Sequence, residues 1–97
     1  MRYDVRFPTA SIEKKFLKAF NAVFPKEVQE QIKGKVLSLA GSPRPYGEPK
    51  IKPPLEVYSY TAQYRLRVGD FRVLYDVDDK RRIVWILALR KRNERTY

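Results

Sequence analysis

Three strand-like runs in the second half of the chain constrain the fold most. They cover residues 55–68, 71–77 and 83–90 and are rich in Val, Ile, Tyr, Leu and Phe, the residue types that favour strands. Because short turns separate them, they predict an antiparallel meander. The stretch 83–89 has no polar alternation, which predicts a strand covered on both faces and therefore central in the sheet.

The turn between the first two runs predicts their register. Gly-Asp between two strands is typical of a two-residue hairpin loop, because its first residue needs a positive φ that glycine adopts freely. With Gly69 and Asp70 as the loop, the expected pairs are Val68 with Phe71, Arg67 with Arg72, Leu66 with Val73, Arg65 with Leu74, and Tyr64 with Tyr75. One face of the hairpin then carries Tyr64, Leu66, Val68, Phe71, Val73 and Tyr75, and the other carries Arg65, Arg67 and Arg72.

This arginine face predicts an anion site. Like charges directly opposite each other on a sheet are destabilising, so a sequence chosen for stability alone would avoid them. One alternative is that the guanidinium groups extend into solvent or pair with Glu56, Asp76 or the terminal carboxylate. We favour a bound anion, because the planar guanidinium donates two parallel hydrogen bonds and suits phosphate.

The first half of the chain predicts a strand and a helical hairpin. Residues 3–7 alternate apolar and polar side chains, as a half-buried strand does. Thr9 or Ser11 can cap a first helix, whose apolar stripe is Ile12, Phe16, Phe20, Val23 and Phe24. Pro25 suits the first turn of a second helix, with the stripe Val28, Ile32, Val36, Leu39 and Ala40 ending at the Gly-Ser-Pro sequence of residues 41–43.

A proline-rich connector joins the two halves. Residues 41–54 hold five of the seven prolines, which stiffens them toward extended geometry. A linker between two domains is the alternative, but the flanking pieces are each too short to bury a core. We therefore expect one domain over residues 1–97, of class α+β, with the order β-α-α-β-β-β.

The composition excludes several kinds of chemistry. The chain has no histidine and no cysteine, so it can form neither an imidazole base, a thiolate nucleophile nor a zinc-thiolate site. Asp76, Asp78 and Asp79 lie at a turn, where Asp is common for local hydrogen-bonding reasons, so we expect no metal and no cofactor. The net charge of +10 favours a polyanionic partner. With no apolar run of ~20 residues and a charged N-terminus, we expect a cytoplasmic protein that does not bind membranes.

The sequence resembles a known family in its hairpin and C-terminal segment. Residues 64–75, Tyr-Arg-Leu-Arg-Val-Gly-Asp-Phe-Arg-Val-Leu-Tyr, are followed by an acidic turn, an apolar strand and a basic segment that closes with Thr-Tyr. This pattern is similar to the RelE/ParE superfamily of toxins from bacterial and archaeal toxin-antitoxin pairs. The order of expected elements over nearly the whole chain is also similar to that family.

The resemblance implies a function, a set of site residues and partners. The RelE branch is a ribosome-dependent messenger-RNA endonuclease, and its pattern of basic residues and a C-terminal tyrosine is matched here by Arg65, Arg67, Arg72, Lys91 or Arg92, and Tyr97. We expect Arg65, Arg67, Arg72, Arg92 and Tyr97 to be catalytic, and Lys50, Lys52, Arg90, Lys91 and Arg95 to bind RNA. The implied partners are a cognate antitoxin protein, messenger RNA and the ribosome.

Such an enzyme needs no metal, because the RNA 2′-hydroxyl can attack the adjacent phosphorus. The arginines would hold the phosphate oxygens, and Tyr97, its pKa lowered by neighbouring cations, would take the hydroxyl proton. Two other functions remain open at this point. A ParE-like protein would inhibit DNA gyrase by binding, without catalysis. A non-toxic RNA-binding module would stack bases on exposed aromatic side chains, for which Tyr46, Tyr58 and Tyr60 are the candidates.

Overall fold

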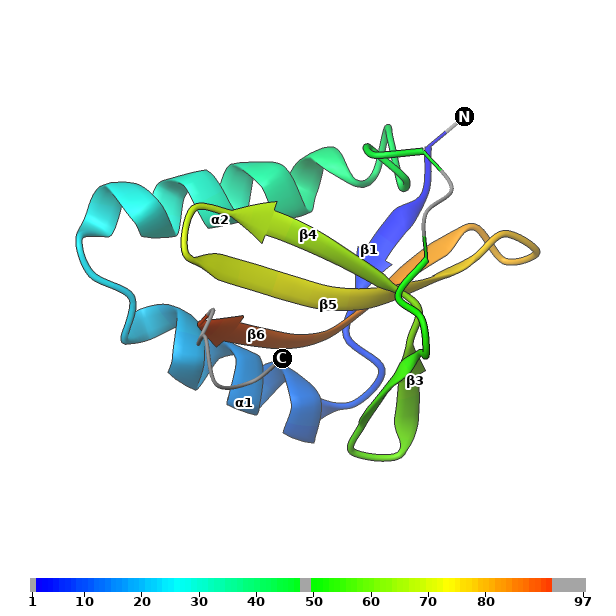
Figure 1. The fold of residues 1–97 in the computed structure, drawn as a ribbon, viewed down its shortest axis with the longest axis horizontal. Coiled ribbons are helices and arrows are strands. Elements are labelled where there is room, and N and C mark those ends of the chain that lie inside the picture. Colours follow the sequence, from blue (N-terminus) through cyan, green and yellow to red (C-terminus); the bar gives the residue numbers. More distant parts are fainter. Residues whose placement is uncertain (1, 48–49, 92–97) are drawn as a thin grey trace.

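The computed structural model describes residues 2–47 and 50–91 of the chain (Figure 1). Two helices follow a short first strand, and five strands follow the connector. The elements are β1 (Asp4–Arg6), α1 (Ala10–Asn21), α2 (Lys26–Ser38), β2 (Leu55–Val57), β3 (Tyr60–Ala62), β4 (Tyr64–Val68), β5 (Phe71–Asp78) and β6 (Ile83–Lys91).

Helix α1 begins after Thr9, one of the two expected caps, and ends earlier than its apolar stripe predicts. The Thr9 hydroxyl accepts a hydrogen bond from the Ile12 amide at 3.1 Å, which satisfies a first-turn donor. The helix stops at Asn21, so the expectation that Phe24 belongs to the buried stripe is wrong: Phe24 is 88% exposed. The Gln29 side-chain amide donates to the Val23 carbonyl at 3.0 Å and so holds the chain between the helices.

Helix α2 begins directly after Pro25, which is its N-cap residue. Ile32 is its fully buried residue, and Leu39 and Ala40, just past the helix end, are also buried. The Tyr3 amide donates to the Ala40 carbonyl at 2.7 Å. This hydrogen bond ties the start of the chain to the end of the helical hairpin.

The main sheet has the strand order β1-β6-β5-β4, with β1 parallel to β6 and the other pairs antiparallel. The meander of β4, β5 and β6 confirms the expected topology. Strand β6 lies between β1 and β5, and its residues 83–89 are buried except for the half-buried Trp85. The absence of polar alternation therefore did indicate a central strand.

The hairpin register is also the expected one. Val68 pairs with Phe71, Arg67 with Arg72, and Tyr64 with Tyr75. Gly69 has φ +58°, the conformation that the turn requires of its first residue.

One expectation about the strands is wrong. Residues 55–68 do not form a single strand: a turn after β2 creates a separate hairpin of β2 and β3, and Gln63 separates β3 from β4. The turn residue Tyr58 has φ 59°, a conformation that normally favours glycine or asparagine. Because a tyrosine occupies this position, the sequence carries no turn signal there.

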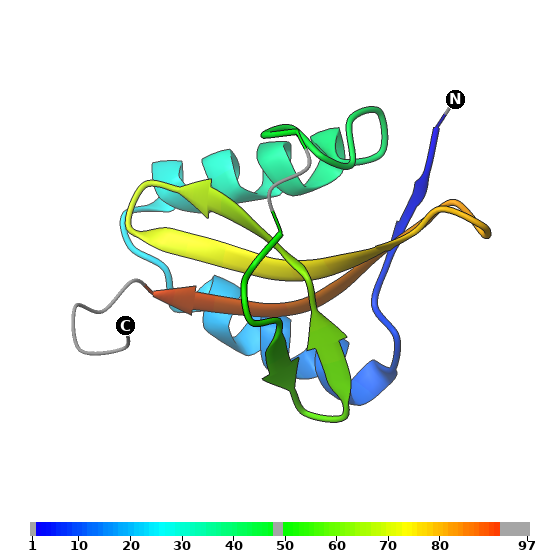
Figure 2. The same ribbon diagram turned by 45° about the vertical axis from the view of Figure 1, so that its right-hand side comes forward.

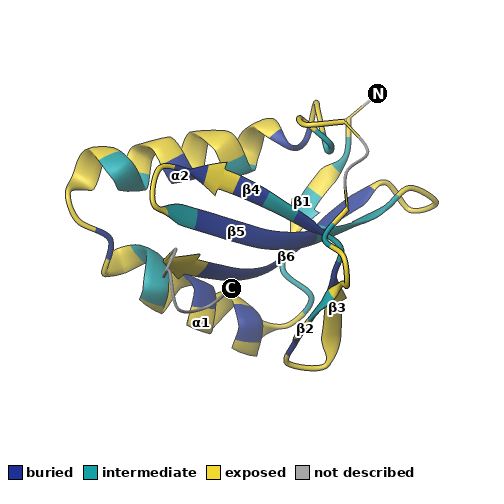
Figure 3. Cartoon of the chain, viewed as in Figure 1, coloured by how far each residue is buried: buried dark blue, intermediate teal, exposed yellow. Residues whose placement is uncertain are grey.

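The two faces of the main sheet are covered by different elements (Figures 2 and 3). Helices α1 and α2 pack on one face, where Phe16, Ile32, Leu66 and Tyr75 belong to the larger core cluster. The β2-β3 hairpin lies over the other face, and its smaller cluster comprises Val57, Ala62, Leu74, Leu87 and Ala88. The hairpin covers only part of its face, and the end toward Gly69 carries the arginines.

Candidate functional site

Three arginines form a row across the main sheet. Arg67 of β4 lies opposite Arg72 of β5, and Arg72 lies opposite Arg90 of β6. Directly opposite residues project to the same face of a sheet, and neighbouring strands lie about 5 Å apart. This arginine row (Arg67, Arg72 and Arg90) therefore concentrates positive charge near the Gly69 turn. The sequence analysis predicted the first pair, and the register of β6 adds Arg90.

A groove at the edge of the sheet extends the arginine row. Arg65, two residues before Arg67, projects to the same face. Together with Arg67 it lines a cavity of about 280 Å³, whose other walls are Tyr46, Lys50 and Ile51 of the connector. The Ile51 amide donates to the Gln63 carbonyl at 2.8 Å, which holds the connector against the outer side of this edge. Lys50 is thereby brought to the arginine face, whereas Lys52 is not among the lining residues of this groove.

Arg72 differs from its neighbours in burial. It is only 6% exposed, whereas Arg67 and Arg90 are exposed and Arg65 is half-buried. The sequence predicted that Arg72 lies on the polar face of the hairpin. It did not predict that Arg72 is buried, because the alternation of residues along β5 does not show which other parts of the chain cover that face. The accessible cations of the row are therefore Arg67 and Arg90, with Arg72 beneath them.

Two of the carboxylates proposed as alternative partners, Glu56 and Asp76, form no ion pair with the exposed arginines of this face. The third, the terminal carboxylate, lies outside the residues that the structure describes. Asp76 accepts a hydrogen bond from the Gln63 side chain at 3.3 Å, and burial raises the pKa of this carboxyl. Among residues 2–47 and 50–91, no carboxylate lies within ion-pair distance of Arg65, Arg67 or Arg90. Within this part of the chain the charge of these three residues stays available to an external anion.

The basic residues at the C-terminus divide between two faces. Lys91 lies opposite Phe71, which packs against the larger core, so Lys91 belongs to the helix-covered face rather than to the arginine row. The predicted site residues Arg92, Arg95 and Tyr97 lie outside the residues that the structure describes.

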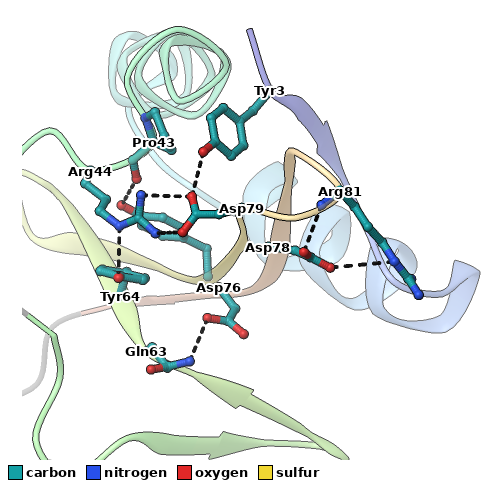
Figure 4. Close-up of polar contacts among 10 residues, drawn as sticks. Tyr3, Pro43, Arg44, Gln63, Tyr64, Asp76, Asp78, Asp79 and Arg81 are labelled. Carbon is teal, nitrogen blue, oxygen red and sulfur yellow. Dashed lines mark hydrogen bonds and ion pairs between the residues drawn. The ribbon is translucent and has the colours of Figure 1, made fainter. Parts of the chain in front are cut away.

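A second polar cluster, which the sequence analysis missed, centres on Arg44 (Figure 4). Its guanidinium donates to both oxygens of Asp79, at 3.1 and 2.6 Å, and to the Tyr64 hydroxyl at 3.0 Å. The Tyr3 hydroxyl donates to the same Asp79 carboxylate at 2.6 Å, and the Tyr75 hydroxyl donates to the Pro43 carbonyl at 2.8 Å. This Arg44 cluster joins the connector to β4, to β5 and to the turn after β5, and it joins that turn to the residue just before β1.

The protonation states in the Arg44 cluster follow from these contacts. Hydrogen bonds from Arg44 and Tyr3 hold the pKa of Asp79 below its ordinary value of 3.8. The hydrogen bond from Tyr3 to Asp79 raises the pKa of the Tyr3 hydroxyl, and burial raises the pKa of the Tyr75 hydroxyl. The ion pair is consequently charged near neutral pH and orients the connector that carries Tyr46 and Lys50. An arginine between two prolines, upstream of an acidic turn, was the signal available in the sequence.

The acidic residues of this region each have a separate partner. Asp79 binds Arg44, Asp78 pairs with Arg81, and Asp76 accepts from Gln63 (Figure 4). In the described parts of the chain, no three acidic side chains are grouped so that they could hold a metal ion. The same residues contain no helix of the length and apolar character that crossing a membrane requires.

An apolar groove lies between the two helices. Its volume is about 310 Å³, and it is lined by Phe16, Leu17, Phe20, Ile32, Lys33, Val36 and Leu37. Leu17 and Leu37 are 42% and 57% exposed. Apolar side chains left exposed beside one another are typical of protein-protein contact surfaces.

Comparison with known proteins identifies the class of this fold. Residues 10–96 match the family model of the ParE toxin of the type II toxin-antitoxin system, parDE. The fold resembles that of the archaeal RelE-RelB complex from Pyrococcus horikoshii, with 29% identity over 97% of this chain and 99% of that chain and a TM-score of 0.70. No curated protein matched the sequence.

Two further structures share the fold. The toxin-antitoxin complex RelBE2 of Mycobacterium tuberculosis matches with 24% identity over 95% of this chain and 100% of that chain and a TM-score of 0.56. The intact E. coli RelBE complex matches with 22% identity, over 95% and 98% of the two chains, and a TM-score of 0.62. The fold and the matched model together define a toxin of a type II toxin-antitoxin system. The chain belongs to the RelE/ParE toxin superfamily.

Proposed function

We propose that this toxin is a RelE-type endoribonuclease that cuts messenger RNA during translation. The observation that carries the proposal is the arginine row with Arg65 and Lys50 beside it. These cations gather on one face, and the described carboxylates leave three of the arginines available. A sheet face of this kind suits the sugar-phosphate backbone of a nucleic acid.

The arrangement supports cleavage by the RNA itself. The 2′-oxygen attacks the adjacent phosphorus while the bond from phosphorus to the 5′-oxygen breaks, which leaves a 2′,3′-cyclic phosphate and a 5′-hydroxyl. Negative charge builds on the phosphate oxygens in between. Arg67 would stabilise that charge directly, and Arg72 would add to the positive potential from beside it in the row. Arg65 would hold a flanking phosphate. Donors fixed in advance toward developing charge commonly contribute about 3 kcal/mol each.

The base that accepts the 2′-hydroxyl proton must be a group other than an arginine, because arginine stays protonated in proteins. We propose that Tyr97 accepts the 2′-hydroxyl proton and that Arg92 stabilises or protonates the leaving 5′-oxygen. The helix-side position of Lys91 supports Arg92 over Lys91 for the second role. Lys50, Lys52, Arg90, Lys91 and Arg95 would add contacts to the RNA backbone.

The alternative is a ParE-like toxin that binds DNA gyrase without cutting RNA. The matching family model favours it, since that model describes ParE. The arginine row supports the nuclease, since closely facing cations suit the negative charge that builds on a phosphate during cleavage. Likeness to the archaeal RelE, at a TM-score of 0.70, also supports the nuclease.

We further propose that a cognate antitoxin neutralises this toxin. Solved relatives are complexes of RelE with RelB, and two surfaces of this chain suit an acidic, amphipathic segment. One is the arginine row. The other is the apolar groove between the helices, which has Lys33 in its lining.

Two assays run side by side separate the nuclease from the gyrase inhibitor. After brief expression, primer extension on cellular messenger RNA should reveal cuts inside translated frames, and plasmid supercoiling should stay normal. Arg67→Ala, with the same expression level, should lose most of the cuts. Loss of supercoiling without cuts would instead support the ParE-like function.

A further inference from the structure

Among residues 2–47 and 50–91, three tyrosines are substantially exposed, and only one of them lies at the arginine face. Tyr46, Tyr58 and Tyr60 are 50%, 54% and 36% exposed. Tyr58 has the Lys15 ammonium 4.0 Å from its ring centroid, and Tyr60 lines a different cavity with Asp76 and Trp85. Tyr46 alone shares a groove with Arg65 and Arg67.

The Tyr46 ring is held in place by the edge of the sheet. Its hydroxyl accepts a hydrogen bond from the Arg67 amide at 3.2 Å and donates one to the Arg67 carbonyl at 3.3 Å. These are the groups of β4 that point away from β5, so the phenol takes the place of a further strand. A ring fixed in this way loses little conformational entropy when a ligand covers it.

The walls of the groove combine two kinds of chemistry. Tyr46 and Ile51 supply a flat aromatic surface and an aliphatic one, and Lys50, Arg65 and Arg67 supply cations. A phosphate alone would need only the cations. An aromatic ring beside basic residues is the combination with which proteins bind single-stranded nucleic acid, because every base can stack on the ring.

We propose that Tyr46 and Ile51 form a nucleobase subsite, in which one base of the RNA stacks on the Tyr46 ring while Arg65 and Arg67 bind its phosphate. This inference rests on the proposed function for the identity of the ligand as RNA. The subsite adds a contact to a base, made by Tyr46 and Ile51 in the groove beside the arginine row. Tyr46 would thus fix the position of the strand along the sheet, and not take part in proton transfer.

Binding of a short, labelled 2′-O-methyl oligoribonucleotide to the full chain tests the subsite, because blocking the 2′-oxygen prevents self-cleavage. The same backbone without bases is the matched probe. Tyr46→Ala should weaken binding of the base-containing strand about tenfold, within the roughly 5- to 150-fold that loss of a stacking ring produces. It should leave binding of the abasic strand unchanged. Tyr46→Phe, which keeps the ring, should lose much less.

Tyr58→Ala is the control, since this tyrosine is equally exposed and lies away from the groove. It should bind both probes as the wild type does. Equal weakening of both probes by Tyr46→Ala, or wild-type binding of both, would overturn the subsite. In either case a wild type that still cuts messenger RNA leaves the proposed function standing, whereas a wild type that neither binds nor cuts RNA contradicts both.

Discussion

Arg72 is the residue whose environment is hardest to explain by stability alone. It is a mostly buried cation between two other arginines on neighbouring strands. Like charges directly opposite each other on a sheet are destabilising, and Arg72 has one such neighbour on each side. The fold retains this arrangement, which is consistent with a role for the arginine row in binding an anion.

We predict opposite effects on stability for two members of the row. Arg67→Ala should keep or slightly raise the free energy of unfolding, because an exposed cross-strand repulsion of ~0.2–1 kcal/mol is removed. Arg72→Ala should lower it by ~1–3 kcal/mol, because the loss of a buried side chain from a packed face outweighs the cross-strand repulsions removed with it. Urea unfolding followed by circular dichroism measures both. A more strongly destabilised Arg67→Ala would contradict this account of the row.

Neutralising Asp76, in β5, and Asp79, in the turn after it, should change the stability of the fold in opposite directions. The pKa of Asp79 is lowered by its hydrogen bonds, so its charged form stabilises the fold above the ordinary pKa, and that stability is lost as the pH falls through the lowered value. The pKa of Asp76 is raised by burial, so its charged form disfavours folding at neutral pH.

Accordingly, Asp79→Asn should lower Tm at pH 7 and Asp76→Asn should raise it. The Asp79→Asn difference should shrink as the pH falls below about 4, through the lowered pKa of Asp79. The Asp76→Asn difference should already shrink at a higher pH, as the pH falls through the raised pKa of Asp76. Thermal melts across this pH range provide the measurement. A loss of Tm at neutral pH in Asp76→Asn would show that its hydrogen bond with Gln63 outweighs the cost of burial.

At the level of elements, local signals in the sequence predicted most of the main sheet and its register. The Gly69 turn predicted the β4-β5 pairing, and of the two expected caps, Thr9 and Ser11, Thr9 caps α1. The β2-β3 hairpin could not be predicted, because Tyr58 adopts a positive φ without a glycine signal. For the site, alternation predicted the face shared by Arg65, Arg67 and Arg72. It could not predict Arg44 or the groove, because both depend on where the connector docks in three dimensions.

Alanine substitutions at Gly69 and Gly34 test whether the positive φ of Gly69 determines the β4-β5 turn. Gly69 has φ +58° and Gly34 lies in helix α2, and a Cβ added at either meets no atom within 4 Å. Gly69→Ala should therefore lower the free energy of unfolding by about 1–2 kcal/mol through backbone strain alone. Gly34→Ala should raise it by about 1 kcal/mol, because alanine favours helix. Equal effects of the two changes would mean that φ at Gly69 does not determine the turn.

On the scale of the whole molecule, charge and apolar surface lie on opposite sides of the main sheet. The chain carries a net charge of +10, and the arginine row concentrates part of it on the face that the helices leave open. The apolar groove lies on the helical side. One partner could bind either side, or wrap around the molecule and bind both.

Association with the antitoxin should therefore depend strongly on salt. We expect the protein encoded beside this toxin to co-purify with it, and its association rate to fall as ionic strength rises, because opposite charges speed the encounter of two proteins. Stopped-flow mixing over a salt series measures the rate. An association rate that does not change with salt would contradict a role for the charged face in neutralisation.

Cleavage on programmed ribosomes tests the central claim most directly. In a single-turnover reaction with excess toxin, the wild type should cut the bound messenger RNA and leave a 5′-hydroxyl on the downstream fragment, the end that attack by the 2′-oxygen produces. Tyr97→Phe should bind similarly and cut ~10²- to 10⁴-fold more slowly, the usual contribution of a general base. Intact messenger RNA after incubation with the folded wild type, or a 5′-phosphate at the cut, would contradict the account.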